Sequence, residues 1–155
     1  MKKAIKYVVL LVAAFAVVFV SSNKSNQVFA ASKPTYSKLY KTAKSKLHAH
    51  YSYGAVGPNC FDCSGYTKYI YKKSVKKNLP RTAQSQYQSF KKVSVQNRKP
   101  GDLVFFGGSK RSISHVGIYV GKGLMINAQN RGVVLESVSA PWWHAVGYSR
   151  PANLK

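Results

Sequence analysis

The chain has 155 residues, with 25 Lys or Arg against three Asp or Glu, so its formal net charge at pH 7 is +22. This length suits about one ordinary domain, and a charge of this size bears on partners and solubility rather than on the fold. The basic residues are scattered and have no aromatic platform between them, which argues against a dedicated nucleic-acid reader.

The first 30 residues have the pattern of an export signal. Lys2, Lys3 and Lys6 give a positive start, and an unbroken apolar run of 14 residues follows from Tyr7 to Val20. This run is shorter than the roughly 20 residues that a helix needs to cross a bilayer, so an uncleaved anchor is the weaker interpretation. Small residues in Val28-Phe29-Ala30 predict cleavage after Ala30, which leaves residues 31–155 as the exported domain.

Cleavage after Ala30 would remove four lysines (Lys2, Lys3, Lys6 and Lys24) and leave 21 basic and three acidic residues, a net charge of +18. An exported cation of this kind meets the anionic polymers of a cell wall. We therefore expect a secreted protein that associates with the cell wall through non-specific charge attraction.

Three helices are predicted in the first half of the exported domain. Apolar residues recur at helical spacing over residues 36–48. Asp62 is a good N-cap for a second helix over residues 63–73. Pro80 breaks the chain before a third helix, for which Thr82 is the expected cap.

The second half of the chain changes to short strands, which are rich in β-branched and aromatic residues and separated by glycine-containing turns. Helices followed by an antiparallel meander indicate an α+β fold in which the helices pack on one sheet face. The expected strands cover residues 103–106, 115–120, 124–128, 133–137 and 145–149.

Cys63, His115 and Asn127 have the order of a Cys-His-Asn nucleophile system. A thiolate is the active nucleophile, so the pKa of Cys63 is expected to fall through the helix dipole and a nearby imidazolium. A hairpin closed at residues 121–123 would bring His115 and Asn127 nearly opposite each other on one sheet face. A slip of one residue in that register would point Asn127 away.

The surrounding residues extend this pattern over nearly the whole exported domain. The chain resembles the NlpC/P60 family of cell-wall cysteine peptidases, a papain-like group that hydrolyses the stem peptides of peptidoglycan. Six stretches carry the resemblance, in the order of the family: Tyr51-Ser52-Tyr53-Gly54, Phe61-Asp62-Cys63-Ser64-Gly65, Leu79-Pro80-Arg81-Thr82, residues 99–106, His115-Val116-Gly117-Ile118-Tyr119 and Met125-Ile126-Asn127-Ala128.

The resemblance implies a role for each matching residue. Cys63 would be the nucleophile, His115 the general base, and Asn127 the polar third member, a position that is most often histidine in the family. The catalytic set implies neither a metal nor a cofactor. The substrate side would be formed by Tyr51, which assists the oxyanion or the substrate, and by Asp62 and Ser64, which hold the amino end of the substrate. Ala55 replaces the second glycine of a family loop and is expected to reshape that loop slightly.

The implied activity is that of a monomeric endopeptidase that cleaves stem-peptide amides, with the bond between the γ-carboxyl of D-glutamate and the diamino acid as the family's target. Spacing alone does not choose that bond. The alternatives are an N-acetylmuramoyl-L-alanine amidase or an acyltransferase on the same fold, and a non-catalytic cationic protein that binds the cell wall.

Cys60 and Cys63 form a C-x-x-C pair, a spacing that also occurs in redox and zinc sites. Zinc would need further Cys or His ligands, for which His48 and His50 are weak candidates. A thioredoxin-like motif would need a βαβ setting that the sequence lacks. A reversible disulfide between Cys60 and the nucleophile is a further hypothesis, and His144, beside Trp142 and Trp143, is a candidate for lining a substrate groove.

Overall fold

The computed structural model describes residues 34–155. The predicted export signal, residues 1–30, lies outside the described residues. Within residues 34–155 no helix is long and apolar enough to cross a bilayer.

The three predicted helices are confirmed, and each begins at a capping side chain. The hydroxyl of Thr35 accepts from the N–H of Lys38, and the carboxylate of Asp62 accepts from that of Gly65. Thr82 forms a reciprocal capping box with Ser85. The helices are α2 (Tyr36–Lys44), which ends four residues earlier than predicted, α3 (Cys63–Val75) and α4 (Ala83–Ser89), and a short 3-10 helix, η1, covers Val95–Asn97.

The main sheet has six antiparallel strands in the order β3-β8-β4-β5-β6-β7. The five predicted strands are present, and β4 to β7 form the expected meander. The last strand differs from a meander because it returns to pair with β4. The strands are β3 (Lys91–Val93), β4 (Leu103–Ser109), β5 (Ser112–Gly121), β6 (Leu124–Gln129), β7 (Gly132–Ser137) and β8 (Ala145–Arg150).

Two short strands that the sequence did not predict lie before α3. They are β1 (His50–Tyr51) and β2 (Cys60–Phe61), which pair in parallel. Their pairing brings Tyr51 beside Phe61, two residues before the start of α3. The loop between them is therefore anchored at both ends next to that helix start.

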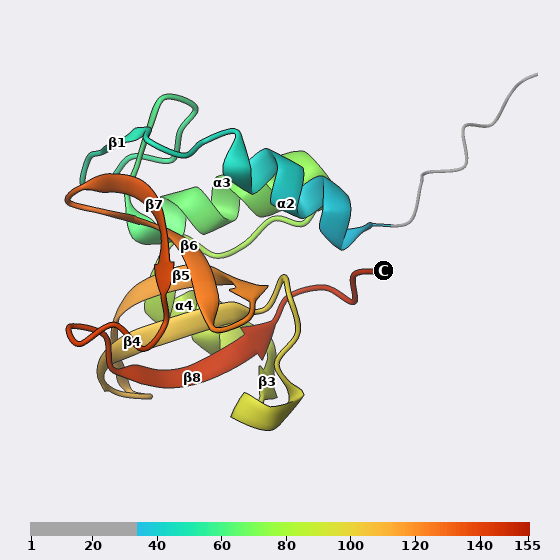
Figure 1. Cartoon of the computed structure of the whole chain (residues 1–155), viewed down its shortest axis with the longest axis vertical. Coiled ribbons are helices and arrows are strands. Elements are labelled where there is room, and N and C mark those ends of the chain that lie inside the picture. The colour runs from blue at the N-terminus through green and yellow to red at the C-terminus, as the bar shows by residue number, and fades with distance from the viewer. Residues whose placement is uncertain (1–33) are drawn as a thin grey trace, which may run out of the picture. The chain divides into compact units, whose positions relative to one another are not determined.

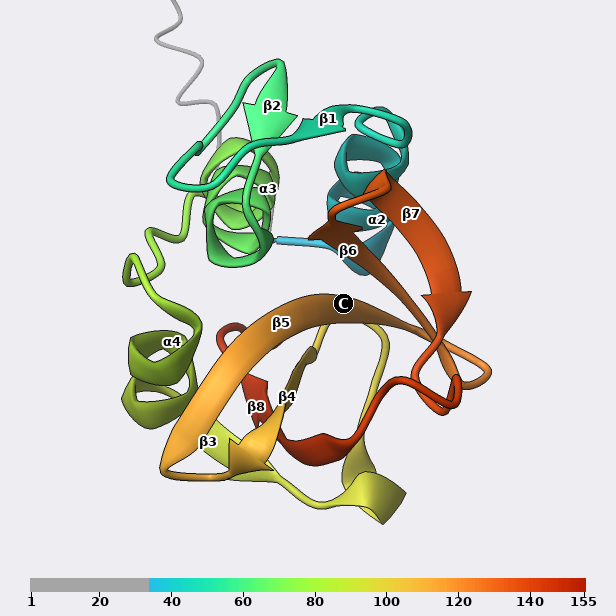
Figure 2. The same cartoon turned by 90° about the vertical axis from the view of Figure 1, so that its left-hand side faces the viewer.

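The helices pack against one side of a strongly curved sheet, with α3 over β5 and β6 and α4 against β4 and β5 (Figures 1 and 2). Strand β5 is the long curved strand that passes beneath α3 in Figure 2. The family-like layout of helices on an antiparallel sheet is therefore confirmed. It places the first turn of α3 beside β5.

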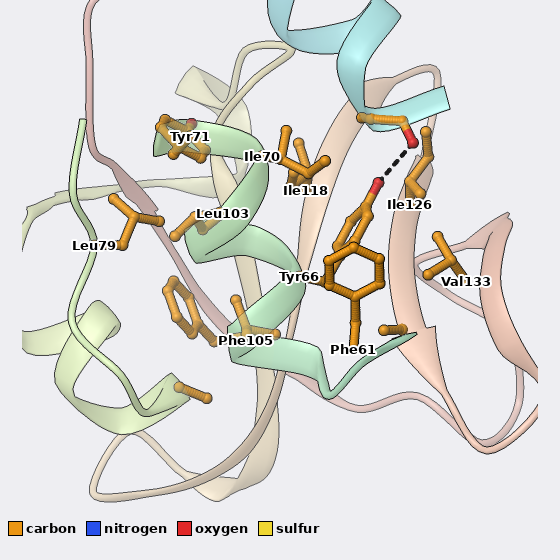
Figure 3. Close-up of a cluster of buried hydrophobic side chains, with 14 of the residues drawn as sticks. Phe61, Tyr66, Ile70, Tyr71, Leu79, Leu103, Phe105, Ile118, Ile126 and Val133 are labelled. Atoms are coloured by element: carbon orange, nitrogen blue, oxygen red, sulfur yellow. Dashed lines mark hydrogen bonds between the residues drawn. The ribbon is translucent and has the colours of Figure 1, made fainter. Parts of the chain in front are cut away.

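The core between α3 and the sheet is apolar and contains few polar anchors (Figure 3). The hydroxyl of the buried Tyr66 donates to the carbonyl of Ala43 at 3.1 Å, which ties α3 to α2. A second apolar cluster lies on the opposite sheet face. The largest fully buried apolar side chains are Tyr66, Tyr71, Phe61, Phe105, Leu39, Ile70, Leu79, Leu103, Ile118, Met125 and Ile126.

Candidate active site

Cys63 is the first residue of α3, and its sulfur lies against the backbone of β5. The Sγ atom is 4.0 Å from the carbonyl oxygen of Ser114, and the backbone of Val116 also hydrogen-bonds to the thiol. These two backbone groups belong to the residues on either side of His115. The fold therefore brings the predicted nucleophile to the segment that carries the predicted base.

A close backbone contact holds the loop before α3 against the start of the helix. A Cβ atom on Gly65 would lie 2.1 Å from the carbonyl oxygen of Ala55, so only glycine fits there. The amide of Asp62 donates to the same carbonyl at 2.9 Å. Ala55 itself is not among the residues with positive φ, so the alanine that replaces the family's second glycine is accommodated without backbone strain.

His115 and Asn127 are joined by a hydrogen bond of 2.9 Å between Nε2 and Oδ1. Ile118 lies opposite Ile126 in the β5–β6 ladder, and this register continued along the strands places Asn127 beside Gly117. Asn127 is therefore two residues diagonal from His115, not nearly opposite it. Because the offset is even, both side chains remain on one face.

Gly117 makes the diagonal contact possible. A Cβ atom on Gly117 would lie 3.1 Å from the Cβ of Asn127 and 2.8 Å from the sulfur of Met125. The missing side chain leaves room for the amide to reach across to the imidazole. Without this gap the Asn127 side chain would have to move away from His115.

Two aromatic side chains enclose the His115 ring. Trp143 stacks on it, with ring centroids 4.5 Å apart and planes inclined by 19°. Phe106 lies 5.9 Å from the same ring and 4.7 Å from Trp143. The sequence did not single out Trp143 as a partner of His115, because the contact joins residues far apart in the chain. The stacking restricts the orientation of the imidazole.

The electrostatics of the resting site differ from the expectation of a preformed thiolate. Burial raises the pKa of the Cys63 thiol, and the Asp62 carboxylate raises it further, while backbone hydrogen bonds from Val116 and Ser64 offset only part of this. Burial lowers the pKa of His115, and its contacts with Asn127 and the charge of Glu136 offset only part of that fall. The expectation of a lowered pKa for Cys63 is therefore wrong at rest, because desolvation outweighs the stabilising donors.

Glu136, on β7, is a member of the site that the sequence did not single out. Its Oε1 accepts from Nδ2 of Asn127 at 2.7 Å and from Nε2 of Gln129 at 2.5 Å. Its Oε2 accepts from Arg131 at 3.1 Å. The sequence contains one feature that could have drawn attention to Glu136: it is one of only three acidic residues in the chain.

A pocket of about 370 Å³ opens beside Cys63 and brings the predicted substrate-side residues together. Tyr51, Asp62 and Ser64 all line it, and Tyr51 is 37% exposed. His115 and Asn127 are not among its lining residues, although Ser114, which precedes His115 on β5, is one of them. The remaining lining residues are Tyr53, Gly54, Arg81, Thr82, Ala83, Gln84, Ile113 and Ser114.

The Asp62 carboxylate is already occupied by protein donors. It accepts from the amides of Gly65 at 2.7 Å and Gly54 at 3.0 Å, and it is paired with Arg81. Burial alone would raise the pKa of this carboxyl, but the bonds from Arg81 and the backbone amides lower it overall. Ser64 also accepts from Arg81 at 3.0 Å. These contacts position the loop and the helix start, and the substrate-holding role of Asp62 and Ser64 stays a prediction.

Cys60 lies on β2, three residues before Cys63. Cys60 and Cys63 are both free thiols. Among residues 34–155 no group of three or more His, Cys, Asp and Glu side chains is arranged to hold a metal ion. His144 lines a second cleft of about 640 Å³ together with Lys92, Arg98 and Trp143, the residue that stacks on His115.

Comparisons with known proteins show the family and the fold of the chain. The protein-family model described as "NlpC/P60 family" matches residues 48–149 of the chain. The chain is 49% identical over 110 residues to "Probable endopeptidase p60" of Listeria monocytogenes, an alignment that covers 70% of this chain and 22% of that protein. It is 37% identical over 134 residues to the bifunctional muramidase/DL-endopeptidase CwlT of Bacillus subtilis, covering 83% of this chain and 40% of that protein. The chain thus spans less than half the length of these curated relatives.

Two solved structures have the same fold. The NlpC/p60 domain of the peptidoglycan hydrolase SagA superposes with a TM-score of 0.67 at 30% identity, covering 74% of this chain and 97% of that chain. RipD of Mycobacterium tuberculosis, described as a non-catalytic NlpC/p60 domain protein adapted to peptidoglycan binding, superposes with a TM-score of 0.64 at 25% identity. That alignment covers 74% of this chain and 95% of RipD.

Proposed function

The chain belongs to the NlpC/P60 family, and from this premise we propose that it is a peptidoglycan hydrolase that cleaves stem-peptide amides through Cys63. The observation that carries the proposal is the position of the thiol, which lies between the backbone groups flanking His115. The hydrogen bond from His115 to Asn127 supplies the third member. The names of SagA and CwlT support peptidoglycan as the substrate class and a DL-endopeptidase bond as the target.

The proton on the imidazole follows from its partner. Oδ1 of Asn127 can only accept, so Nε2 of His115 carries the hydrogen and Nδ1 is left as the base. Nδ1 takes the proton of the Cys63 thiol, and the thiolate attacks the amide carbon of the substrate. Backbone N–H groups at the start of α3 stabilise the oxyanion.

The second half of the reaction restores the enzyme. The imidazolium of His115 gives its proton to the leaving amine as the carbon–nitrogen bond breaks, which leaves an acyl group on Cys63. His115 then removes a proton from water, which attacks the thioester. The carbon–sulfur bond breaks, the departing Cys63 thiolate takes the proton back from the imidazolium, and the acid product is released. Because Cys63 is a thiol at rest, the imidazole must remove its proton during the attack.

The setting and the partners of the protein belong to the same proposal. The export pattern of residues 1–30 supports secretion, and the charge of the chain supports retention by anionic wall polymers. Peptidoglycan stem peptides would be the substrate, the protein would act as a monomer, and neither a metal nor a cofactor takes part.

RipD gives a specific reason to retain a second candidate, because it is a non-catalytic member with the same fold. The amidase and the acyltransferase would use the same thiol on a different bond or with a different acceptor. The retained Cys63, His115 and Asn127 favour a catalytic protein. Bond cleavage therefore separates the candidates.

Digestion of purified peptidoglycan under reducing conditions, with fragments identified by mass spectrometry, tests the proposal. The native protein should release stem-peptide fragments, Cys63→Ala should release none, and Cys60→Ala should match the native protein as a control for loss of a thiol. Cleavage between muramic acid and the first amino acid would identify an amidase. Binding without cleavage by all three proteins would support the non-catalytic candidate.

A further inference from the structure

We infer that Glu136 is a positioning residue that selects the reactive tautomer of His115 by orienting the side chain of Asn127. The inference rests on the proposed function, and it extends the catalytic row by one residue on a third strand. Hydrogen bonds join His115 on β5, Asn127 on β6 and Glu136 on β7, and Cys63 on α3 lies against the backbone of Ser114, next to His115.

An asparagine side chain has two nearly isosteric ends, one that accepts hydrogen bonds and one that donates them. If the Asn127 amide turned over, its Nδ2 would face His115 and donate to Nε2. The hydrogen of the ring would then lie on Nδ1, and the base next to Cys63 would be lost. The orientation of this amide therefore decides which nitrogen of the ring is basic.

Glu136 makes one orientation favourable. An ionised carboxylate only accepts, so it requires the donor end of Asn127, at 2.7 Å, and thereby turns the acceptor end toward His115. Asn127 is fully buried, so a turned amide would find no water to replace the lost bonds. The Glu136 side chain is only 10% exposed, which strengthens this preference.

The carboxylate is held in place by two further donors. Gln129 donates to the same oxygen as Asn127, and Arg131 pairs with the other oxygen from a largely exposed position. Pairs on the β6–β7 ladder place Met125 opposite Glu136 and Asn127 opposite Val134, so Glu136 reaches Asn127 along a diagonal. The negative charge also raises the pKa of His115 and so stabilises the imidazolium that forms during the reaction.

The test is to replace Glu136 with glutamine and to read the protonation of His115 directly. Imidazole nitrogen shifts measured by NMR report the tautomer and the pKa of the ring independently of any substrate. In the native protein, neutral His115 should carry its hydrogen on Nε2. In Glu136→Gln, a fraction of Nδ1–H tautomer should appear and the pKa of His115 should fall, because a favourable charge is lost. On peptidoglycan, kcat should drop by about 10- to 100-fold while KM changes little, as is typical for residues that orient a reacting group.

Asp102→Asn is the matched control, because Asp102 is also a buried carboxylate paired with an arginine, Arg150, but outside this row. It should destabilise the protein without altering the tautomer or the pKa of His115. An unchanged tautomer and pKa in Glu136→Gln would overturn the inference, whatever the activity. If the native protein cleaves no peptidoglycan, the proposed function fails while the NMR result still decides the role of Glu136.

Discussion

At the residue scale, the proposed nucleophile and the proposed base both lie in surroundings that favour their neutral forms. The Cys63 thiol is desolvated and lies near the negative charge of Asp62, and the His115 imidazole is enclosed by Trp143 and Phe106. Both environments disfavour charge. At rest Cys63 is therefore a thiol and His115 a neutral imidazole, and in the proposed mechanism charge develops only when a substrate is attacked.

The pH dependence of hydrolysis and of Cys63 alkylation follows from the directions in which the pKa values of His115 and Cys63 are shifted. His115 acts as a base only when it is neutral, which occurs above its pKa, and that pKa lies below the ordinary 6.5. The acid limb of kcat/KM for hydrolysis should therefore have its midpoint below pH 6.5. Alkylation of Cys63 by iodoacetamide needs the thiolate, so its rate should stay low at pH 6 and rise only above about pH 8.5. Equal alkylation rates from pH 5 to pH 8 would instead indicate a preformed thiolate–imidazolium pair.

Gly65→Ala should destabilise the protein through the contact between α3 and the preceding loop. The added Cβ would lie 2.1 Å from the Ala55 carbonyl oxygen, and no rotamer change can relieve a clash between two backbone segments. We expect a loss of about 1–3 kcal/mol in the free energy of unfolding, the usual range for overpacking. Chemical denaturation measures it, with Gly108→Ala as control because a Cβ there meets no atom within 4 Å. Equal midpoints for the two variants would contradict the prediction.

At the element scale, a buried glutamine on α4 makes three hydrogen bonds that join α4 and the segment at Pro80 to the start of α3. Oε1 of Gln86 accepts from Thr67 at 2.8 Å, and its Nε2 donates to the carbonyls of Ser64 at 3.0 Å and Pro80 at 2.9 Å. Gln86 is fully buried. These bonds hold the first turn of α3, and hence Cys63, against the helix that follows Pro80.

Gln86→Ala should therefore lower both stability and activity. The carbonyl of Pro80 would lose its donor, whereas Thr67 and the carbonyl of Ser64 could still bond each other at 2.9 Å. One unpaired group of this kind costs about 1–3 kcal/mol. Thermal unfolding and peptidoglycan release measure the two effects. Gln88→Ala, an exposed position on the same helix, should behave as the native protein. A Gln86→Ala protein with an unchanged melting temperature would show that the linkage contributes nothing.

The helices and strands that the sequence predicts correctly are those that depend on local sequence pattern. The start of α3 at Asp62 and the hairpin from His115 to Asn127 depend on local pattern, and both were predicted. The predicted β5–β6 register was wrong by two residues. The alternation of side chains determines which sheet face each residue lies on, but it does not determine which residue of the neighbouring strand lies opposite. Strands of two or three residues, such as β1, β2 and β3, are too short to show periodicity.

The missed site residues share a different cause. Arg81, Glu136 and Trp143 act through contacts that only the tertiary fold creates. Arg81, for example, follows Asp62 by 19 positions, and the whole of α3 lies between them. No local spacing predicts such a pair. The return of β8 to β4, which shapes the sheet next to Trp143, is likewise a non-local pairing.

At the scale of the whole molecule, the few negative charges are turned inward. The chain has three carboxylates, and each is paired with an arginine and nearly buried: the side chains of Asp62, Asp102 and Glu136 are 8%, 3% and 10% exposed. The described surface therefore presents lysines and arginines with almost no exposed carboxylate between them. A field of one sign over the whole surface favours any polyanion.

If this diffuse field retains the protein on cell walls, the number of charges should matter and their place should not. Two triple variants, Lys91/Lys92/Lys99→Gln beside η1 and Lys72/Lys73/Lys76→Gln at the end of α3, remove equal charge from two different segments of the chain. In a Cys63→Ala background, which prevents digestion, both should sediment with purified walls less than the parent and by similar amounts. Salt at about 1 M, where the Debye length is roughly 3 Å, should release all three proteins. If only one of the two triple variants sediments less with the walls, or if sedimentation does not change with salt concentration, a single site and not the overall charge binds the wall.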